Sequence, residues 1–225
     1  MESSSSVAST SALPAPESRP LGRVATLLLV GWGVAVSTGM LLAAQHAAAP
    51  GPSGTPPPSW PAAAGLTPAS DRATLLVFAH PRCPCSRATI AELGRLLGRT
   101  GGALDARVLL YRPAGTSPSW AGGELWQKAA AIPGVRVEGD EDGREAKRFD
   151  AVTSGTTLLY DRDGVLRFHG GLTPARGHEG DSTGADAIAR WVTSGAPPTR
   201  SPVFGCAIWD DARIDNSDWR APWTL

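Results

Sequence analysis

The chain has 225 residues, with 21 basic and 21 acidic residues and a formal net charge of zero. This length fits one domain with additional segments. The even charge balance argues against a protein that binds nucleic acid or an anionic membrane surface through electrostatic attraction.

The first predicted element is a membrane-spanning helix. Residues 24–44 contain no charge, and a helix of this length extends about 31 Å, which is enough to cross a bilayer. Arg19 and Arg23 precede this run and the next charge is Asp71, so the positive-inside rule puts the N-terminus in the cytoplasm and the rest outside. Ala47-Ala48-Ala49 fits a signal-peptidase site, but the following proline and the length of the run favour a retained anchor.

Composition divides the chain into five parts. Residues 1–20 are rich in Ser, Ala and Pro and are expected to be disordered, and the membrane helix is assigned to residues 21–46. Residues 47–70, rich in Ala, Gly and Pro, are expected to form a semi-extended linker. The folded domain is assigned to residues 71–206, and residues 207–225 to a C-terminal tail.

Strands and helices alternate through the predicted domain. The predicted strands are 74–79, 106–112, 135–138, 156–160 and 165–168, and the predicted helices are 85–99, 122–131, 144–149 and 186–192. Asp161-Arg162-Asp163-Gly164 indicates a hairpin turn, and Asp181, Ser182 or Thr183 should cap the last helix. The order β-α-β-α-β-β-α predicts an α/β fold: a thioredoxin-like mixed sheet flanked by helices, with an N-terminal transmembrane helix.

The most informative motif is His80-Pro81-Arg82-Cys83-Pro84-Cys85-Ser86-Arg87, where the first strand of the domain turns into a helix. A thiol at a helix N-terminus faces unpaired N–H groups and the positive end of the helix dipole, and both favour the thiolate. We therefore expect Cys83 and Cys85 to interconvert between dithiol and disulfide. Cys83 is the expected nucleophile, because it is nearer the strand end and less enclosed by the helix. His80 either stabilises a thiolate when protonated or bonds the loop backbone.

Two further segments are expected at the same edge of the sheet. The fourth strand should run antiparallel to the first and the fifth parallel to it, so residues 153–155 and the loop 170–181 should lie beside the cysteines. For the charged loop residues, the alternative role is to shape the loop by hydrogen bonds. The supporting candidates are Thr153, Ser154, Gly155, Arg176 and His178.

The third cysteine, Cys206, has several interpretations. An odd thiol outside the cytoplasm suggests a resolving partner, an intermolecular bond or a metal ligand. From Val192 to Cys206 the chain extends at most about 45 Å, so contact with the cysteine turn is allowed but not required. A buried, inert thiol is the structural alternative.

Together these motifs resemble the RedB-like family of membrane-anchored thioredoxin-fold bacterial proteins. The matching segments are 80–87, 91–93, 153–155, 170–171, 176–181 and 203–206. The resemblance implies a thioredoxin fold on the periplasmic, or extracytoplasmic, side of the bacterial inner membrane. The chain departs from the wider thioredoxin superfamily in its Cys-x-Cys spacing and in having Ser154-Gly155 where a cis-proline is expected.

The predicted activity is thiol–disulfide exchange with a thiol or disulfide protein partner. A thiolate would attack the partner disulfide, and the neighbouring cysteine would resolve the mixed disulfide. A disulfide across one residue should be strained and therefore oxidising. This activity needs no cofactor. One alternative is a copper-binding or copper-delivery protein, or a zinc site, with Cys83 and Cys85 as ligands and His178, His80 or Cys206 as the third. Another is a non-catalytic docking domain.

Overall fold

In the computed structural model, the described part of the chain is residues 22–197 and 200–209. The chain separates into two units, Met1–Ala43 and Ala44–Leu225. The predictions for residues 1–20 and for most of the tail 207–225 lie outside the described residues.

The N-terminal unit is dominated by a single long helix. Helix α1 covers Arg23–Ala48, against the predicted 21–46, and includes the whole uncharged run 24–44. Its leucine and valine side chains are largely exposed. By length and composition the helix is able to cross a membrane.

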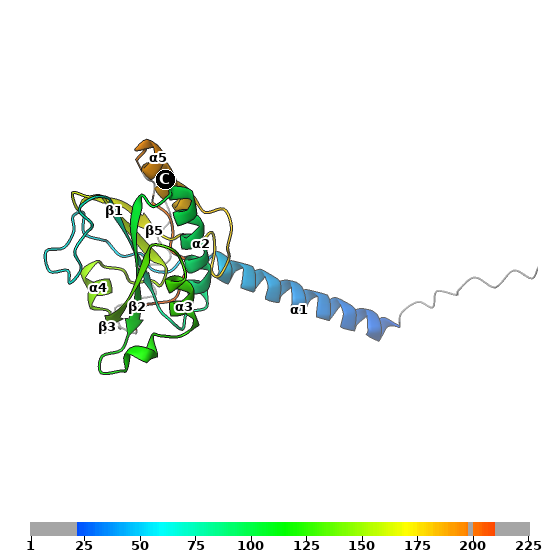
Figure 1. The fold of residues 1–225 in the computed structure, drawn as a ribbon. Coiled ribbons are helices and arrows are strands. Elements are labelled where there is room, and N and C mark those ends of the chain that lie inside the picture. Colours follow the sequence, from blue (N-terminus) through cyan, green and yellow to red (C-terminus); the bar gives the residue numbers. More distant parts are fainter. Residues whose placement is uncertain (1–21, 198–199, 210–225) are drawn as a thin grey trace, which may run out of the picture. The chain divides into compact units, whose positions relative to one another are not determined.

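The second unit is built on a five-stranded mixed sheet (Figure 1). The strands are β1 (Ala73–Ala79), β2 (Leu104–Arg112), β3 (Val135–Glu141), β4 (Thr156–Tyr160) and β5 (Leu166–Gly170), in the spatial order β3-β2-β1-β4-β5. Strands β1, β2 and β3 are parallel, β4 is antiparallel to β1, and β5 is antiparallel to β4. This is the predicted thioredoxin-like topology, and it confirms the fold class.

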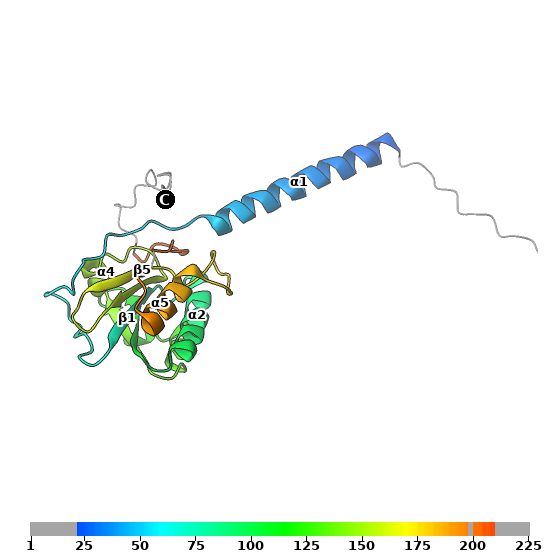
Figure 2. The same cartoon turned by 90° about the horizontal axis from the view of Figure 1, so that it is seen from above.

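Helices cover both faces of the sheet (Figures 1 and 2). They are α2 (Cys85–Thr100), α3 (Glu124–Ala130), α4 (Arg144–Arg148) and α5 (Thr183–Ser194), with a 3-10 turn η1 at Pro118–Trp120. Of the three predicted caps for α5, Ser182 is the one that forms: its Oγ accepts a hydrogen bond from the Ala185 N–H at 3.3 Å.

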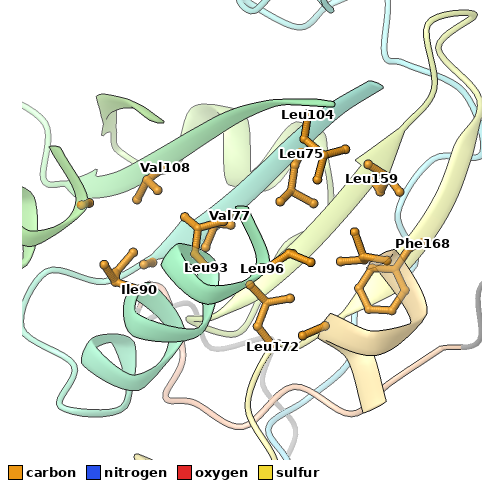
Figure 3. Close-up of a cluster of buried hydrophobic side chains, with 14 of the residues drawn as sticks. Leu75, Val77, Ile90, Leu93, Leu96, Leu104, Val108, Leu159, Phe168 and Leu172 are labelled. Carbon is orange, nitrogen blue, oxygen red and sulfur yellow. The ribbon is translucent and has the colours of Figure 1, made fainter. Parts of the chain in front are cut away.

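The central strand β1 is buried on both faces, which explains its continuous apolar sequence. Leu75 and Val77 point to one core, where they meet Leu93 of α2 together with residues of α3 and α5 (Figure 3). Leu76 and Phe78 point to the second core, which includes a residue of α4. Because β1 is packed between two cores, the position of its carboxyl end, where the cysteine turn begins, is fixed.

The structure differs from the predicted linker at residues 47–70. Trp60 packs against the second core, with its ring in edge contact with Phe149 at 5.1 Å and Tyr160 at 5.2 Å between centroids. The Tyr160 hydroxyl donates a hydrogen bond to the Pro57 carbonyl at 2.9 Å, and the Leu166 N–H donates to the Pro58 carbonyl at 2.9 Å. Prolines lack N–H groups but keep their carbonyl acceptors, and other residues of the segment donate, as the Trp60 N–H does to the Gly164 carbonyl at 2.7 Å. The segment is therefore bound to the domain by hydrogen bonds that it both accepts and donates.

Candidate functional site

The cysteine turn is fixed by backbone hydrogen bonds to the end of β1. The Cys83 N–H donates to the His80 carbonyl at 3.1 Å, and the Ser86 N–H donates to the Cys83 carbonyl at 3.1 Å. Helix α2 begins at Cys85, with Pro84 at its N-cap position and no side-chain cap. Of the first N–H groups of this helix, that of Cys85 donates to the Cys83 sulfur, whereas those of Ser86 and Arg87 donate to the carbonyls of Cys83 and Pro84.

The third cysteine lies at this turn. The segment Val203–Ile208 runs along the loop that precedes β4: the Ser154 N–H donates to the Cys206 carbonyl at 2.7 Å, and the Ile208 N–H donates to the Val152 carbonyl at 3.0 Å. An isolated antiparallel bridge joins Thr153 and Ala207 between these two bonds. All three cysteines are present as thiols, and together they form one cluster.

Cys83 is the centre of the cluster. Burial alone would raise the pKa of its thiol, but hydrogen bonds to its sulfur lower that pKa below the ordinary value. The donors are the N–H and thiol of Cys206, the N–H of Cys85 and the hydroxyl of Ser86. Cys83 is therefore the cysteine best able to exist as a thiolate, as predicted. The reason given for that prediction is wrong in one respect, because Cys83 is only 6% exposed and is more enclosed than Cys85.

The pKa values of the other two thiols, Cys85 and Cys206, are raised instead of lowered. Burial raises the pKa of Cys85, and the charge of Cys83 and the hydrogen bond to it raise the pKa further. Burial and the hydrogen bond to Cys83 raise the pKa of the Cys206 thiol to about 11. Cys83 is therefore the first of the three thiols to lose its proton, and the other two donate hydrogen bonds to its sulfur.

Two buried serines connect the turn to the loop before β4. The His80 N–H donates to Ser154 Oγ at 2.8 Å, and Ser154 Oγ lies 2.7 Å from Ser86 Oγ. A hydroxyl has one hydrogen, so if Ser154 donates to Ser86, then Ser86 keeps its own hydrogen for the Cys83 sulfur or for the His80 carbonyl 3.2 Å away. Ser86 was not predicted to be a site residue, and its only signal in the sequence is its place in the first turn of the helix that follows the cysteines.

Two glycines allow the backbones at this site to approach closely. A Cβ on Gly205 would lie 1.9 Å from the Ser154 carbonyl oxygen, so only glycine lets residues 203–208 lie against this loop. Gly155 has φ +97, a conformation that L side chains rarely adopt, and its N–H donates to the Phe78 carbonyl at 2.7 Å. The predicted trio 153–155 therefore positions the site through its backbone and through Ser154.

Arg176 reaches the cluster from the loop after β5. Its guanidinium donates hydrogen bonds to the Gly205 carbonyl and, at 2.9 Å, to the Ala49 carbonyl. Its positive charge acts to lower the pKa of both Cys85 and Cys206. Of the two loop residues singled out from the sequence, Arg176 is the one whose contacts tie it to the thiols.

His178 belongs to the far part of the same loop. Its exposed ring is hydrogen-bonded through Nδ1 to the Arg176 carbonyl at 2.8 Å. The loop continues onto the side of α2, where the Gly180 N–H donates to the buried carboxylate of Glu92 at 2.6 Å and Arg95 pairs with Glu179 at 2.6 Å. The contacts of His178 are those of the loop-shaping alternative.

His80 bonds the loop backbone, as its structural alternative predicted. The Arg82 N–H donates to His80 Nδ1 at 3.2 Å, and the imidazole stacks on Tyr111 at 5.5 Å and meets Trp120 edge-on at 5.9 Å. These rings, with Lys147 and Trp209 among others, line a cavity of about 520 Å³. His80 thus lies between the cysteine turn and an aromatic hollow in the surface.

Within residues 22–197 and 200–209, no group of three or more His, Cys, Asp or Glu side chains has a geometry that could hold a metal ion. The ligand set proposed for copper, Cys83 and Cys85 with His178, is therefore not assembled in this structure.

Comparisons with known proteins show the fold. No protein-family model matches the chain, and no curated protein matches it. The structure is similar to that of an uncharacterised conserved protein from Geobacillus kaustophilus, with 21% identity and a TM-score of 0.54 over 72% of this chain and 93% of the other. A hypothetical protein from Sinorhizobium meliloti has 25% identity and a TM-score of 0.53 over 71% of this chain and 97% of the other. A secreted disulfide oxidoreductase from Mycobacterium tuberculosis has 16% identity and a TM-score of 0.40 over 56% and 83%.

Proposed function

We propose that this chain is a membrane-anchored thiol–disulfide oxidoreductase with an extracytoplasmic catalytic domain. The observation that carries the proposal is the Cys83 sulfur, which accepts hydrogen bonds from two backbone N–H groups, a hydroxyl and two thiols. Such a site stabilises a thiolate, the nucleophile of disulfide exchange. Either of the two adjacent thiols supplies a second sulfur, which attacks the mixed disulfide and converts it into a disulfide within the chain.

The reaction balances without a cofactor. The Cys83 thiolate attacks one sulfur of a partner disulfide, that S–S bond breaks, and the first partner sulfur leaves as a thiolate. A neighbouring thiol of the cluster, Cys85 or Cys206, loses its proton and attacks the Cys83 sulfur, which releases the second partner sulfur. The partner gains two electrons and two protons while two cluster thiols become a disulfide, and the reverse steps oxidise a partner dithiol.

The location is part of the proposal. The apolar helix α1 supports an anchor, and the arginines at positions 19 and 23 support a cytoplasmic N-terminus. The resemblance to RedB-like proteins supports the periplasmic side of a bacterial inner membrane. A C-terminal reporter enzyme that is active only after export should be active in intact cells. Activity of a reporter that works only in the cytoplasm would contradict this orientation.

The activity is tested on the full chain in detergent micelles. We expect the chain, equilibrated over a series of ratios of reduced to oxidised glutathione, to lose two thiols in one transition. Cys83→Ser should abolish this transition, whereas Arg87→Gln is the matched control, because this exposed arginine of the same helix pairs with Glu124. Three titratable thiols at every ratio, or an unchanged transition in Cys83→Ser, would refute the proposal. Copper content measured on the same reduced sample separates exchange from the copper alternative.

A further inference from the structure

The cluster offers two thiols that could resolve a mixed disulfide on Cys83, and their geometries differ. Cys85 follows Cys83 by two positions and is the first residue of α2, and Pro84 between them already has helical angles, φ −58 and ψ −34. The Cys85 thiol also hydrogen-bonds to the Cys83 sulfur. A disulfide between these two residues would nevertheless close a small, strained ring across Pro84 alone.

Cys206 approaches Cys83 from a separate segment. Both its N–H and its thiol are directed at the Cys83 sulfur. The backbone on either side is held by the Ser154–Cys206 and Ile208–Val152 hydrogen bonds and by the bridge at Ala207. This thiol is therefore pre-positioned on the sulfur that it would attack, without distortion of α2.

The charges at the site also favour Cys206 as the thiol that reacts after Cys83. In the reduced cluster, burial, the hydrogen bond to Cys83 and the negative charge of that thiolate all raise the pKa of the Cys206 thiol. Once Cys83 is part of a mixed disulfide, its negative charge is gone and the pKa of Cys206 falls, while the positive charge of Arg176 still acts to lower it. Cys206 is thus a better nucleophile after Cys83 has reacted than before.

We propose that Cys206, and not Cys85, is the resolving thiol, so that the working disulfide of this protein joins Cys83 to Cys206. This inference rests on the proposed function and adds the residue that completes the reaction. The Cys206 thiolate attacks the Cys83 sulfur of the mixed disulfide, the Cys83–Cys206 bond forms, and the partner leaves as a thiolate. Cys85 then stabilises the negative charge of the Cys83 thiolate by donating a hydrogen bond to it.

The test uses oxidised glutathione as the partner and the full chain in detergent micelles. Reduced wild type, Cys85→Ser and Cys206→Ser are mixed with it, quenched with acid, and weighed by intact-mass spectrometry to follow the glutathione adduct on Cys83. Cys206 as a whole residue is exposed, although neighbouring groups partly desolvate its thiol, and serine keeps a hydroxyl at that position, so the variant retains the fold. We expect the lifetime of the adduct to be at least about tenfold longer in Cys206→Ser than in Cys85→Ser, because Cys206→Ser lacks the positioned nucleophile. Peptide mapping of Cys85→Ser should then find Cys83 joined to Cys206.

The outcomes separate the two proposals. An adduct that persists in Cys85→Ser but decays in Cys206→Ser would overturn the role of Cys206 and leave the proposed function intact. Equal decay in both variants would also overturn it, because either thiol would then suffice. If Cys83 takes up no glutathione in any variant, although circular dichroism shows that each is folded, then the proposed function fails and this inference with it.

Discussion

A disulfide between Cys83 and Cys206 should change the stability of the protein far more than one between Cys83 and Cys85. The two disulfides enclose loops of very different size: 122 residues lie between Cys83 and Cys206 and one between Cys83 and Cys85. A crosslink stabilises mainly by reducing the conformational entropy of the unfolded chain. The loop-entropy relation gives about 5 kcal/mol for the long loop and about 1.6 kcal/mol for the short one.

The difference of about 3 kcal/mol is measurable by thermal unfolding, since each kcal/mol moves the Tm of a protein of this size by roughly 2–4 °C. The comparison uses full-length Cys85→Ser, which forms only the long loop, and Cys206→Ser, which forms only the short one. Each is melted in the same detergent, oxidised and reduced, with circular dichroism as the signal. We expect oxidation to raise the Tm of Cys85→Ser by roughly 6–12 °C more than that of Cys206→Ser. An equal or larger gain for Cys206→Ser would refute the reasoning, because the long loop would then be strained in the folded state.

Three further substitutions probe the structure around the thiols. Gly205→Ala places a Cβ against the Ser154 carbonyl, so it should lower the free energy of unfolding, measured in urea, by about 1–3 kcal/mol. It should also lengthen the lifetime of the glutathione adduct. Adduct decay at the wild-type rate would contradict the close approach of the two backbones. Ser86→Ala removes a donor to the thiolate, which should raise the pKa of Cys83, measured by ultraviolet thiolate absorbance. No change would mean that this hydroxyl serves only the His80 carbonyl. Arg176→Gln removes a positive charge, so the pKa of Cys206 should rise above about 11; a fall would reverse the inferred sign.

The fold was predictable from the sequence because its signals are local. The apolar run from Leu75 to Ala79 has the character of a strand buried on both faces, and Ser182 lies where a helix cap is needed. Once the strand order was fixed, topology alone put Ser154 and the loop of Arg176 at the cysteine turn, and both contacts are present.

The features of the site that could not be predicted from the sequence depend on contacts between residues far apart in the chain. The chain between Val192 and Cys206 is long enough to go in many directions, and the feature that selects one of them is the absence of a side chain at Gly205. Burial of Cys83 was misjudged for the same reason, because the segment that covers it comes from more than a hundred residues away. The role of Ser86 depends on a hydrogen shared with Ser154, which only the assembled site reveals.

The fastened segment between Ala49 and Leu66 changes where the protein can be cut. A version trimmed to begin at residue 71, the boundary that composition suggests, would lose the Trp60 ring from the second core. It would also lose the Gly51 N–H, which donates to the Val203 carbonyl at 2.8 Å, and the Ala49 carbonyl that holds Arg176. Both of those contacts support the segment that carries Cys206. A version without the membrane helix that begins upstream of Ala49 retains these contacts, whereas a shorter one would report on a damaged centre and make an active protein look inert.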